Sequence, residues 1–187
     1  MDPETFLIKL REMNALKFGD FTLASGKSSK FYLDLRLIPS YPRLFKKIGD
    51  LLIKKCRTLD FDIVVGIPTA GVPFATYISI FCEKPLIYLR KEIKSHGTKK
   101  KLEGIKVDNK RVLLVDDLIS SGFSKEFAIQ NIRSERGIVE EILVLVDRRE
   151  KNETNNNWEE ANKVNVVSLF QFSADKLLQF ANNNNLL

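Results

Sequence analysis

Two adjacent carboxylates followed by a serine-rich loop are the residues of this chain best placed to do chemistry. Asp116 and Asp117 come directly after the apolar run Val112–Val115, and the loop Ser120–Ser124 then leads into a helical pattern. A helix N-terminus offers unpaired N–H groups and a positive dipole end, which suit a phosphate, and Gly122 lets the backbone approach it closely. The carboxylates could accept hydrogen bonds from sugar hydroxyls or hold a hydrated Mg²⁺. The structural alternative is that a serine caps the helix and the aspartates end the strand.

A second feature is a basic segment in the middle of the chain. Residues 88–110 hold eight Lys or Arg and three Asp or Glu, so this segment carries most of the net charge of +6. One localised basic segment indicates one polyanionic ligand. A nucleic acid, a membrane surface and a phosphorylated metabolite all satisfy this pattern, and so does a solvated loop with no ligand. The segment lacks the interleaved aromatic residues of a single-strand nucleic-acid platform.

Short apolar strands that alternate with helical segments predict the α/β fold class, with a parallel sheet covered on both faces. The expected strands are Ile63–Gly66, Leu86–Leu89, Val112–Val115, Ile142–Val146 and Val164–Leu169. The expected helices are Leu44–Cys56, Pro73–Phe81, Ser124–Arg136 and Ala174–Ala181. Ligands of open parallel sheets bind at the carboxyl ends of strands. Three strand ends are therefore the places to look: Gly66–Gly71, Arg90–Gly97 and Asp116–Ser124.

The two ends of the chain have a different pattern. Asp2 and Pro3 form a helix start signal. Strands are expected at Phe18–Leu23 and Phe31–Leu35. Near the other end, Lys151–Glu160 is polar and rich in asparagine, which predicts a surface loop.

Length and composition exclude several classes of protein. The 187 residues predict one domain, and 44% hydrophobic residues argue against global disorder. Two cysteines, Cys56 and Cys82, are too few for a disulfide scaffold and favour a reducing compartment. The run Ile63–Cys82 has no charged residue, but its two prolines and two glycines predict a strand, a turn and a helix instead of a membrane span. With no secretory signal pattern at the start, we expect a soluble cytoplasmic protein.

The segment Val112–Ser124 resembles the phosphoribosyl pyrophosphate (PRPP) signature of type I phosphoribosyltransferases. Further segments, in the family's order, resemble orotate phosphoribosyltransferases: Phe21–Lys27 with Ser29–Asp34, Gly66–Gly71, Tyr88–Gly97 and Asp147–Glu150. The resemblance implies the type I phosphoribosyltransferase fold, a mostly parallel central sheet flanked by helices. It implies a single domain, 1–187, with an N-terminal hood over about 1–40, a core over about 41–187 and a mobile catalytic loop over about 91–106.

The resemblance also implies a reaction. The 5-phosphoribosyl group of PRPP would pass to orotate with Mg²⁺, giving orotidine 5′-monophosphate and pyrophosphate, in pyrimidine biosynthesis. The implied catalytic residues are Lys94, His96, Asp116 and Asp117, with Asp117 near the metal through water and most metal ligands from PRPP. The implied PRPP-binding residues are Arg90, Lys91, Lys94, His96, Asp116, Asp117, Leu118, Ile119, Ser120, Ser121, Gly122, Phe123 and Ser124. The implied orotate-binding residues are Tyr32, Leu33, Ser120 and Arg148.

The implied assembly is a homodimer in which the loop Lys91–Lys106 reaches the neighbouring subunit's site. Three positions depart from the family pattern: Ala24 where many members have Lys, Phe123 where Gly or Thr is usual, and Thr69-Ala70 in place of Tyr-Lys. These changes remove a cation and a hydroxyl from the expected PRPP contacts.

Three other functions compete with this interpretation. Another phosphoribosyltransferase would act on a purine or on uracil, which the resemblance of Arg148 and the basic loop argues against. A non-catalytic sensor that binds DNA would need a groove-reading element, and the roughly twenty residues before the first family motif cannot hold one, so no nucleic-acid or membrane partner is expected. A bifunctional enzyme would need a (β/α)₈ barrel, so we expect any orotidine monophosphate decarboxylase to be a separate chain.

Overall fold

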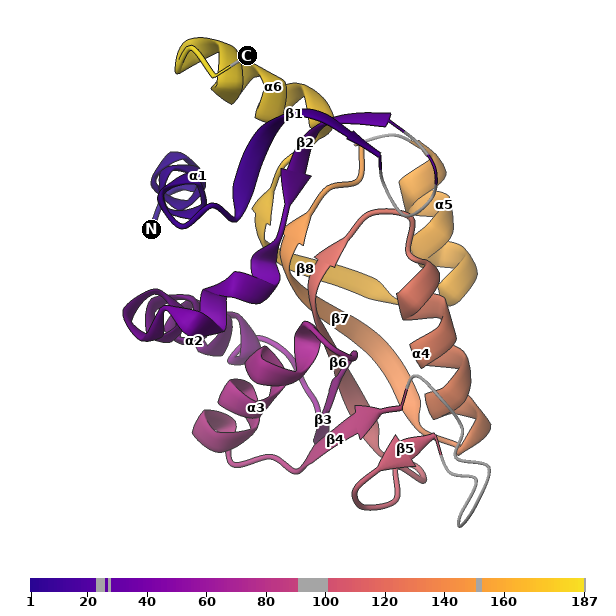
Figure 1. Cartoon of the computed structure of the whole chain (residues 1–187). Coiled ribbons are helices and arrows are strands. Elements are labelled where there is room, and N and C mark those ends of the chain that lie inside the picture. The colour runs from indigo at the N-terminus through magenta and orange to yellow at the C-terminus, as the bar shows by residue number, and fades with distance from the viewer. Residues whose placement is uncertain (23–25, 27, 91–100, 151–152, 187) are drawn as a thin grey trace.

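A six-stranded sheet forms the centre of the protein, in a computed structural model that describes residues 1–22, 26, 28–90, 101–150 and 153–186. The strand order is β5-β4-β3-β6-β7-β8 (Figure 1). All neighbouring pairs are parallel except β4 and β5. The strands are β3 (Ile63–Gly66), β4 (Leu86–Leu89), β5 (Leu102–Glu103), β6 (Arg111–Ile119), β7 (Ile138–Asp147) and β8 (Asn165–Gln171). The expected α/β class with a mostly parallel sheet is confirmed.

Helices cover both faces of this sheet (Figure 1). On one side lie α2 (Pro42–Cys56) and α3 (Gly71–Cys82), and on the other lie α4 (Phe123–Ser134) and α5 (Glu153–Asn162). Successive residues of β6 alternate between two cores, as the two-residue period of a strand requires. Leu113 and Val115 belong to the core that also holds α2 and α3 residues, whereas Val112 and Leu114 belong to the core that holds α4 residues.

The N-terminal region forms a separate small layer. It comprises α1 (Pro3–Glu12), the antiparallel pair β1 (Leu16–Thr22) and β2 (Ser28–Leu33), and a 3₁₀ helix (Leu35–Ser40). The predicted start of α1 is confirmed, because Asp2 Oδ1 accepts a 2.8 Å hydrogen bond from Thr5 N. Phe6 stacks on Phe170 of β8 at 4.2 Å between ring centroids, which joins this layer to the main core. The C-terminal helix α6 (Ala174–Asn183) packs into the same core.

One sequence prediction is wrong outright. The segment 151–160 was expected to be a surface loop, but α5 spans Glu153–Asn162. Asparagine is a weak helix former, so the pattern gave no helical signal. Trp158 and Glu159 bind α4 and β8 from this helix, and tertiary contacts of this kind override local propensity.

Several element boundaries also differ from the prediction. Leu102 and Glu103, within the loop expected over about 91–106, form β5 against β4, and residues 91–100 of that loop lie outside the described residues. In the N-terminal layer, β1 begins at Leu16 and β2 ends at Leu33, since Leu35 already belongs to the 3₁₀ helix. Among the helices of the described ranges, none has the length and apolar character needed to cross a membrane.

The turn between β3 and α3 lies directly against β6. Ile67 N donates a 2.9 Å hydrogen bond to Val115 O, and Gly71 N donates one of 2.9 Å to Ile67 O. A Cβ atom on Gly71 would lie 2.3 Å from Val115 O and 2.9 Å from Asp116 Cα, closer than any real contact. Glycine at this position therefore allows the start of α3 to pack directly against the backbone of β6.

We predict that Gly71→Ala lowers the free energy of unfolding by about 1–3 kcal/mol, because the backbone of β6 must move to admit the methyl group. Urea denaturation followed by circular dichroism measures this value. The control is Gln130→Ala on the exposed face of α4, where the change should stay within about 0.5 kcal/mol. Equal unfolding midpoints for Gly71→Ala and the wild type would contradict the close packing.

Candidate active site

The carboxyl ends of three neighbouring strands bring the candidate residues together. Gly66 of β3 lies beside Val115 of β6, and Ile119 of β6 lies beside Asp147 of β7. Arg148 N donates a 2.9 Å hydrogen bond to Ile119 O. The predicted edge is confirmed, but β6 does not end at residue 115: it continues through both aspartates to Ile119. Both carboxylates therefore stand on a rigid strand.

Asp116 forms a buried ion pair that the sequence did not reveal. Its Oδ2 lies 2.6 Å from Lys125 Nζ of α4, and both side chains are less than a tenth exposed. Lys125 Nζ also binds Leu118 O and lies 3.2 Å from Ser124 Oγ. The ion pair occupies Oδ2 of Asp116, and the expected contact of Asp116 with ribose hydroxyls stays a prediction. Asp116 and Lys125 tie the strand to the start of α4.

Asp117 is the carboxylate that remains for a ligand. Its Oδ1 accepts a 2.7 Å hydrogen bond from Leu118 N. Burial, and after it the charge of the neighbouring Asp116, raises the pKa of Asp117 from 3.8 to about 7, against the opposing effect of Lys125. The charged form of Asp117 is therefore disfavoured when no ligand is bound. A cation or a hydroxyl donor beside Asp117 would stabilise this charged form.

The loop after β6 has the backbone geometry of an anion cradle. Gly122 has φ +81° and precedes α4, which begins at Phe123 without a side-chain cap. The alternative in which a serine caps the helix is therefore wrong. The first N–H groups of a helix have no partner within it, and Ser120, Ser121 and Ser124 are exposed beside them. The Phe123 side chain is 78% exposed, so its bulk does not fill the loop.

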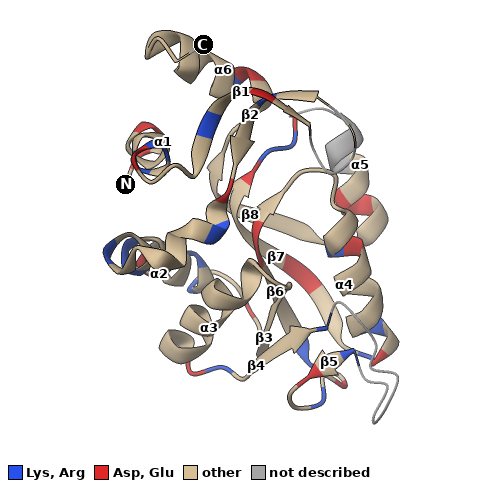
Figure 2. Ribbon diagram, in the orientation of Figure 1, with Lys and Arg blue, Asp and Glu red and all other residues tan. Residues whose placement is uncertain are grey.

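A cavity of about 230 Å³ lies between this loop and the ends of β3 and β4. Its lining residues are Ile67, Pro68, Leu89, Arg90, Phe123, Ser124 and Phe127. The Arg90 guanidinium forms an ion pair with Glu103 of β5. Figure 2 shows basic residues around β4 and β5, where the described part of the basic segment lies. The predicted residues Lys91, Lys94 and His96 lie outside the described residues.

Arg148 is placed on the other side of the loop. Its guanidinium lies 4.6 Å from the ring centroid of Phe31 in β2, a cation–π contact. Its Nε is buried and has no hydrogen-bond partner among the residues described. Burial lowers the Arg148 pKa. A half-buried guanidinium in this state fits a planar carboxylate, which it can bind through two parallel hydrogen bonds.

The two other residues expected near the base lie on β2. Tyr32 is partly exposed, and its hydroxyl accepts a 3.0 Å hydrogen bond from Arg36 Nη2. The Leu33 side chain is buried in the core, so only its backbone remains for a ligand contact. The contact between Phe31 and Arg148 places this strand beside the end of β7.

The comparisons with known proteins agree on one family. A profile described as the phosphoribosyl transferase domain matches residues 38–176. The orotate phosphoribosyltransferase of Staphylothermus marinus is 45% identical over 147 residues, which cover 79% of this chain and 72% of that protein. The one from Methanocaldococcus jannaschii is 35% identical over 170 residues, which cover 90% and 96%. This chain belongs to the orotate phosphoribosyltransferase family.

Solved structures support the same assignment. The orotate phosphoribosyltransferase of Aeropyrum pernix superposes with a TM-score of 0.78 at 30% identity, covering 95% of this chain and 97% of that one. Leishmania donovani UMP synthase gives a TM-score of 0.81 at 33% identity and covers 100% of this chain. This chain spans only 40% of the length of that protein. The type I phosphoribosyltransferase fold expected from the sequence is confirmed.

Three residues of this family member's site were missed from sequence. Lys125 gave no signal, because a lysine in the first turn of an amphipathic helix is ordinarily exposed. Phe31 sits on a strand of the N-terminal layer, and only the fold brings it to Arg148. Trp158 is the only tryptophan, which could have marked it, but its asparagine-rich surroundings predicted a loop.

We predict that Asp117→Asn stabilises the fold at pH 8 but not at pH 4. A carboxylate whose folded pKa lies above its unfolded value contributes stability that is present below about pH 4 and lost as pH rises to about 7. The asparagine removes that loss, so the gain in Tm should grow between these two pH values and then level off. The same variant should lose most of its turnover.

The control for this prediction is Asp20→Asn, where the carboxylate is 85% exposed and pairs with Lys30 on the surface. Its Tm at pH 8 should stay close to that of the wild type, because an exposed ion pair contributes little stability. Thermal unfolding by calorimetry between pH 4 and 8 measures both variants. A pH-independent Tm difference for Asp117→Asn would contradict the raised pKa.

Proposed function

We propose that the site transfers the 5-phosphoribosyl group of PRPP to orotate, giving orotidine 5′-monophosphate and pyrophosphate with Mg²⁺. The observation that carries this proposal is the placement of two different anion sites on one strand end. The loop Ser120–Ser124 suits a phosphate, and the Arg148 guanidinium, with an unpartnered Nε among the described residues, suits a carboxylate. The hydrogen bond from Arg148 N to Ile119 O supports the proposal, because it brings Arg148 to the residue directly before this loop.

The proposed reaction develops charge on the sugar, and orotate carries a carboxylate; Asp117 and Arg148 are the side chains suited to these two charges. Breaking the bond between C1 of the ribose and pyrophosphate leaves positive charge on the sugar. The attacking nitrogen of orotate then bonds to C1 and releases its proton to the solvent. The Asp117 carboxylate would accept hydrogen bonds from the ribose hydroxyls and stabilise the positive sugar electrostatically. Arg148 would bind the orotate carboxylate and orient the ring toward C1.

The leaving group requires cations. Arg90 lies at the cavity on the β4 side of the loop, and we propose that it binds pyrophosphate together with Lys91, Lys94 and His96. To do so, Arg90 must exchange its ion pair with Glu103 for the substrate. Cations that contact pyrophosphate more strongly as its charge grows lower the barrier of the reaction.

The acidic residues fit a Mg²⁺ ion that arrives with the substrate. Lys125 engages Asp116, so Asp117 is the carboxylate suited to hold such an ion through water. Mg²⁺ keeps several waters and commonly binds one or two carboxylates together with substrate phosphates. When bound, it supplies positive charge that neutralises the phosphates of PRPP.

We also propose a homodimer, as the sequence resemblance implies. Two adjacent apolar residues of α3, Ile80 and Phe81, are 65% and 58% exposed. Large exposed apolar side chains at the end of one helix support a protein contact at this place. Sedimentation equilibrium of the wild type and of Phe81→Asp tests it, because a monomeric wild type would refute the dimer.

The direct test of the reaction is the loss of orotate absorbance with purified protein, PRPP and Mg²⁺, with each omitted in turn. We expect turnover only when all three are present. Adenine, guanine, hypoxanthine and uracil serve as alternative bases in the same assay. Turnover of one of these bases in place of orotate would assign another phosphoribosyltransferase activity. PRPP binding without any turnover would leave a non-catalytic sensor.

We predict that Arg148→Ala raises the KM for orotate by about 10- to 100-fold while the KM for PRPP changes little. The range follows from losing a charged hydrogen-bonded pair worth about 1.5–3 kcal/mol. The control is Arg136→Ala, an exposed arginine paired with Asp108, which should leave both constants unchanged. Steady-state kinetics decide the matter, and an equal rise in both constants would remove Arg148 from the base site.

A further inference from the structure

Trp158 lies against the outer side of the phosphate loop. A Cβ atom on Gly122 would be 2.5 Å from Trp158 Cε2 and 2.6 Å from its Nε1, so the indole ring touches the glycine backbone directly. Gly122 is buried although the serines on both sides of it are exposed. The left-handed conformation of Gly122, φ +81°, is thus covered by a rigid aromatic surface.

The indole also holds a carboxylate of α4, the helix that follows the loop. Trp158 Nε1 donates a 2.6 Å hydrogen bond to Glu126 Oε1, and Glu126 belongs to the first turn of α4. A phosphate at the start of α4 would be repelled by a carboxylate that turned toward it. The hydrogen bond holds the Glu126 carboxylate at the indole nitrogen.

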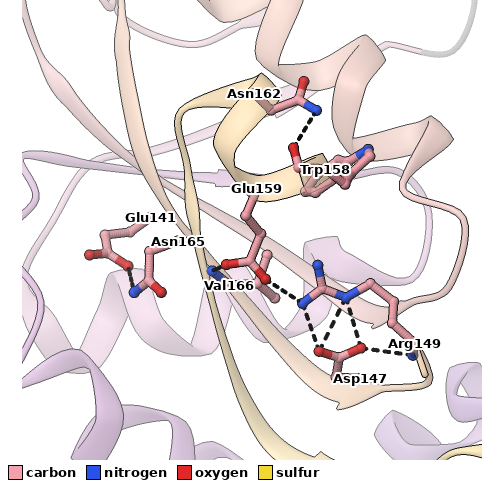
Figure 3. A network of polar contacts seen from close by, with 8 residues as sticks. All are labelled: Glu141, Asp147, Arg149, Trp158, Glu159, Asn162, Asn165 and Val166. Atoms are coloured by element: carbon pink, nitrogen blue, oxygen red, sulfur yellow. Dashed lines mark hydrogen bonds and ion pairs between the residues drawn. The ribbon is translucent and has the colours of Figure 1, made fainter. Parts of the chain in front are cut away.

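Trp158 is itself fixed by a buried ion-pair network at the end of β7 (Figure 3). The Arg149 guanidinium lies 5.9 Å from the ring of Trp158. Arg149 Nη2 pairs with Asp147 at 2.8 Å and with Glu159 at 2.7 Å. Glu159 Oε2 in turn accepts a 3.0 Å hydrogen bond from Val166 N. The ring is therefore held between the strands of the sheet and the loop.

We propose that Trp158 is a positioning residue for the 5′-phosphate: it holds the loop Ser120–Ser124 in its binding conformation and keeps Glu126 away from the bound anion. This role rests on the proposed function only in requiring that the loop binds the 5′-phosphate. It also gives α5 a place in substrate binding. Arg149 contacts both Trp158 and Asp147, so it connects the ring that packs on the loop to the end of β7, next to Arg148.

The experiment measures the affinity of ribose 5-phosphate by calorimetry. Trp158→Ala removes both the surface and the hydrogen bond, and its affinity should fall by about tenfold or more. Trp158→Phe keeps an aromatic ring but loses the N–H donor, which should cost about threefold to tenfold. The matched control is Phe45→Ala, which removes an aromatic contact with Phe74 and Tyr77 on the opposite face of the sheet. Its affinity should equal that of the wild type.

A second substitution separates the packing of Trp158 on the loop from its effect on the Glu126 charge. In the double variant Trp158→Phe with Glu126→Gln, the freed side chain has no charge, so most of the affinity should return to within about threefold of the wild type. No recovery would overturn the electrostatic part. Steady-state kinetics should show a raised KM for PRPP with an unchanged KM for orotate in Trp158→Phe, a difference that a loss of stability alone would not produce.

Affinities within about twofold of the wild type in both single variants would overturn the positioning role. Trp158→Phe keeps the test valid if Trp158→Ala does not fold. The result is independent of the base that the enzyme uses. A wild type that binds ribose 5-phosphate but does not convert orotate would refute the proposed reaction and leave the role of Trp158 intact.

Discussion

The buried ion pair between Asp116 and Lys125 is the interaction on which the rest of the site depends. It joins the middle of the sheet to the first turn of α4, while Gly71 lets the turn after β3 pack against the same aspartate. Removing one partner of a buried pair typically costs about 3–5 kcal/mol, because the other charge stays buried without compensation. The pair therefore fixes three segments at one point. It also neutralises one of two adjacent carboxylates, which leaves Asp117 as the one whose charge is available to a ligand.

Neighbouring residues of the same type serve different purposes at the end of β7. Arg149 is buried and meets two carboxylates, Asp147 and Glu159, so its charge is compensated within the protein. Arg148 lies on Phe31, and its Nε has no hydrogen-bond partner in the described part of the chain. One arginine therefore supports the fold, and the other keeps a buried hydrogen-bonding group without a partner in the described part of the chain.

The loop Ser120–Ser124 is contacted by a helix that has little intrinsic tendency to form. The segment Glu153–Asn162 is rich in asparagine, and its stability depends on what Trp158 and Glu159 contact. Those contacts reach Glu126, Arg149 and Val166, which belong to three other segments of the chain. The helix and the loop thus stabilise each other, which is why local sequence gave no sign of either the helix or its role.

The sequence by itself determined the fold class, the edge of the sheet that carries the site, and the family. These follow from local signals: apolar strands that alternate with helices, a glycine and serine loop after two aspartates, and motifs in a characteristic order. Only the tertiary structure decided which aspartate is engaged by Lys125, that Phe31 lies beneath Arg148, and that α5 exists. The physical reason is that burial and charge compensation depend on residues far apart in the chain. A local pattern can place a side chain on an element, but only packing decides which groups surround it.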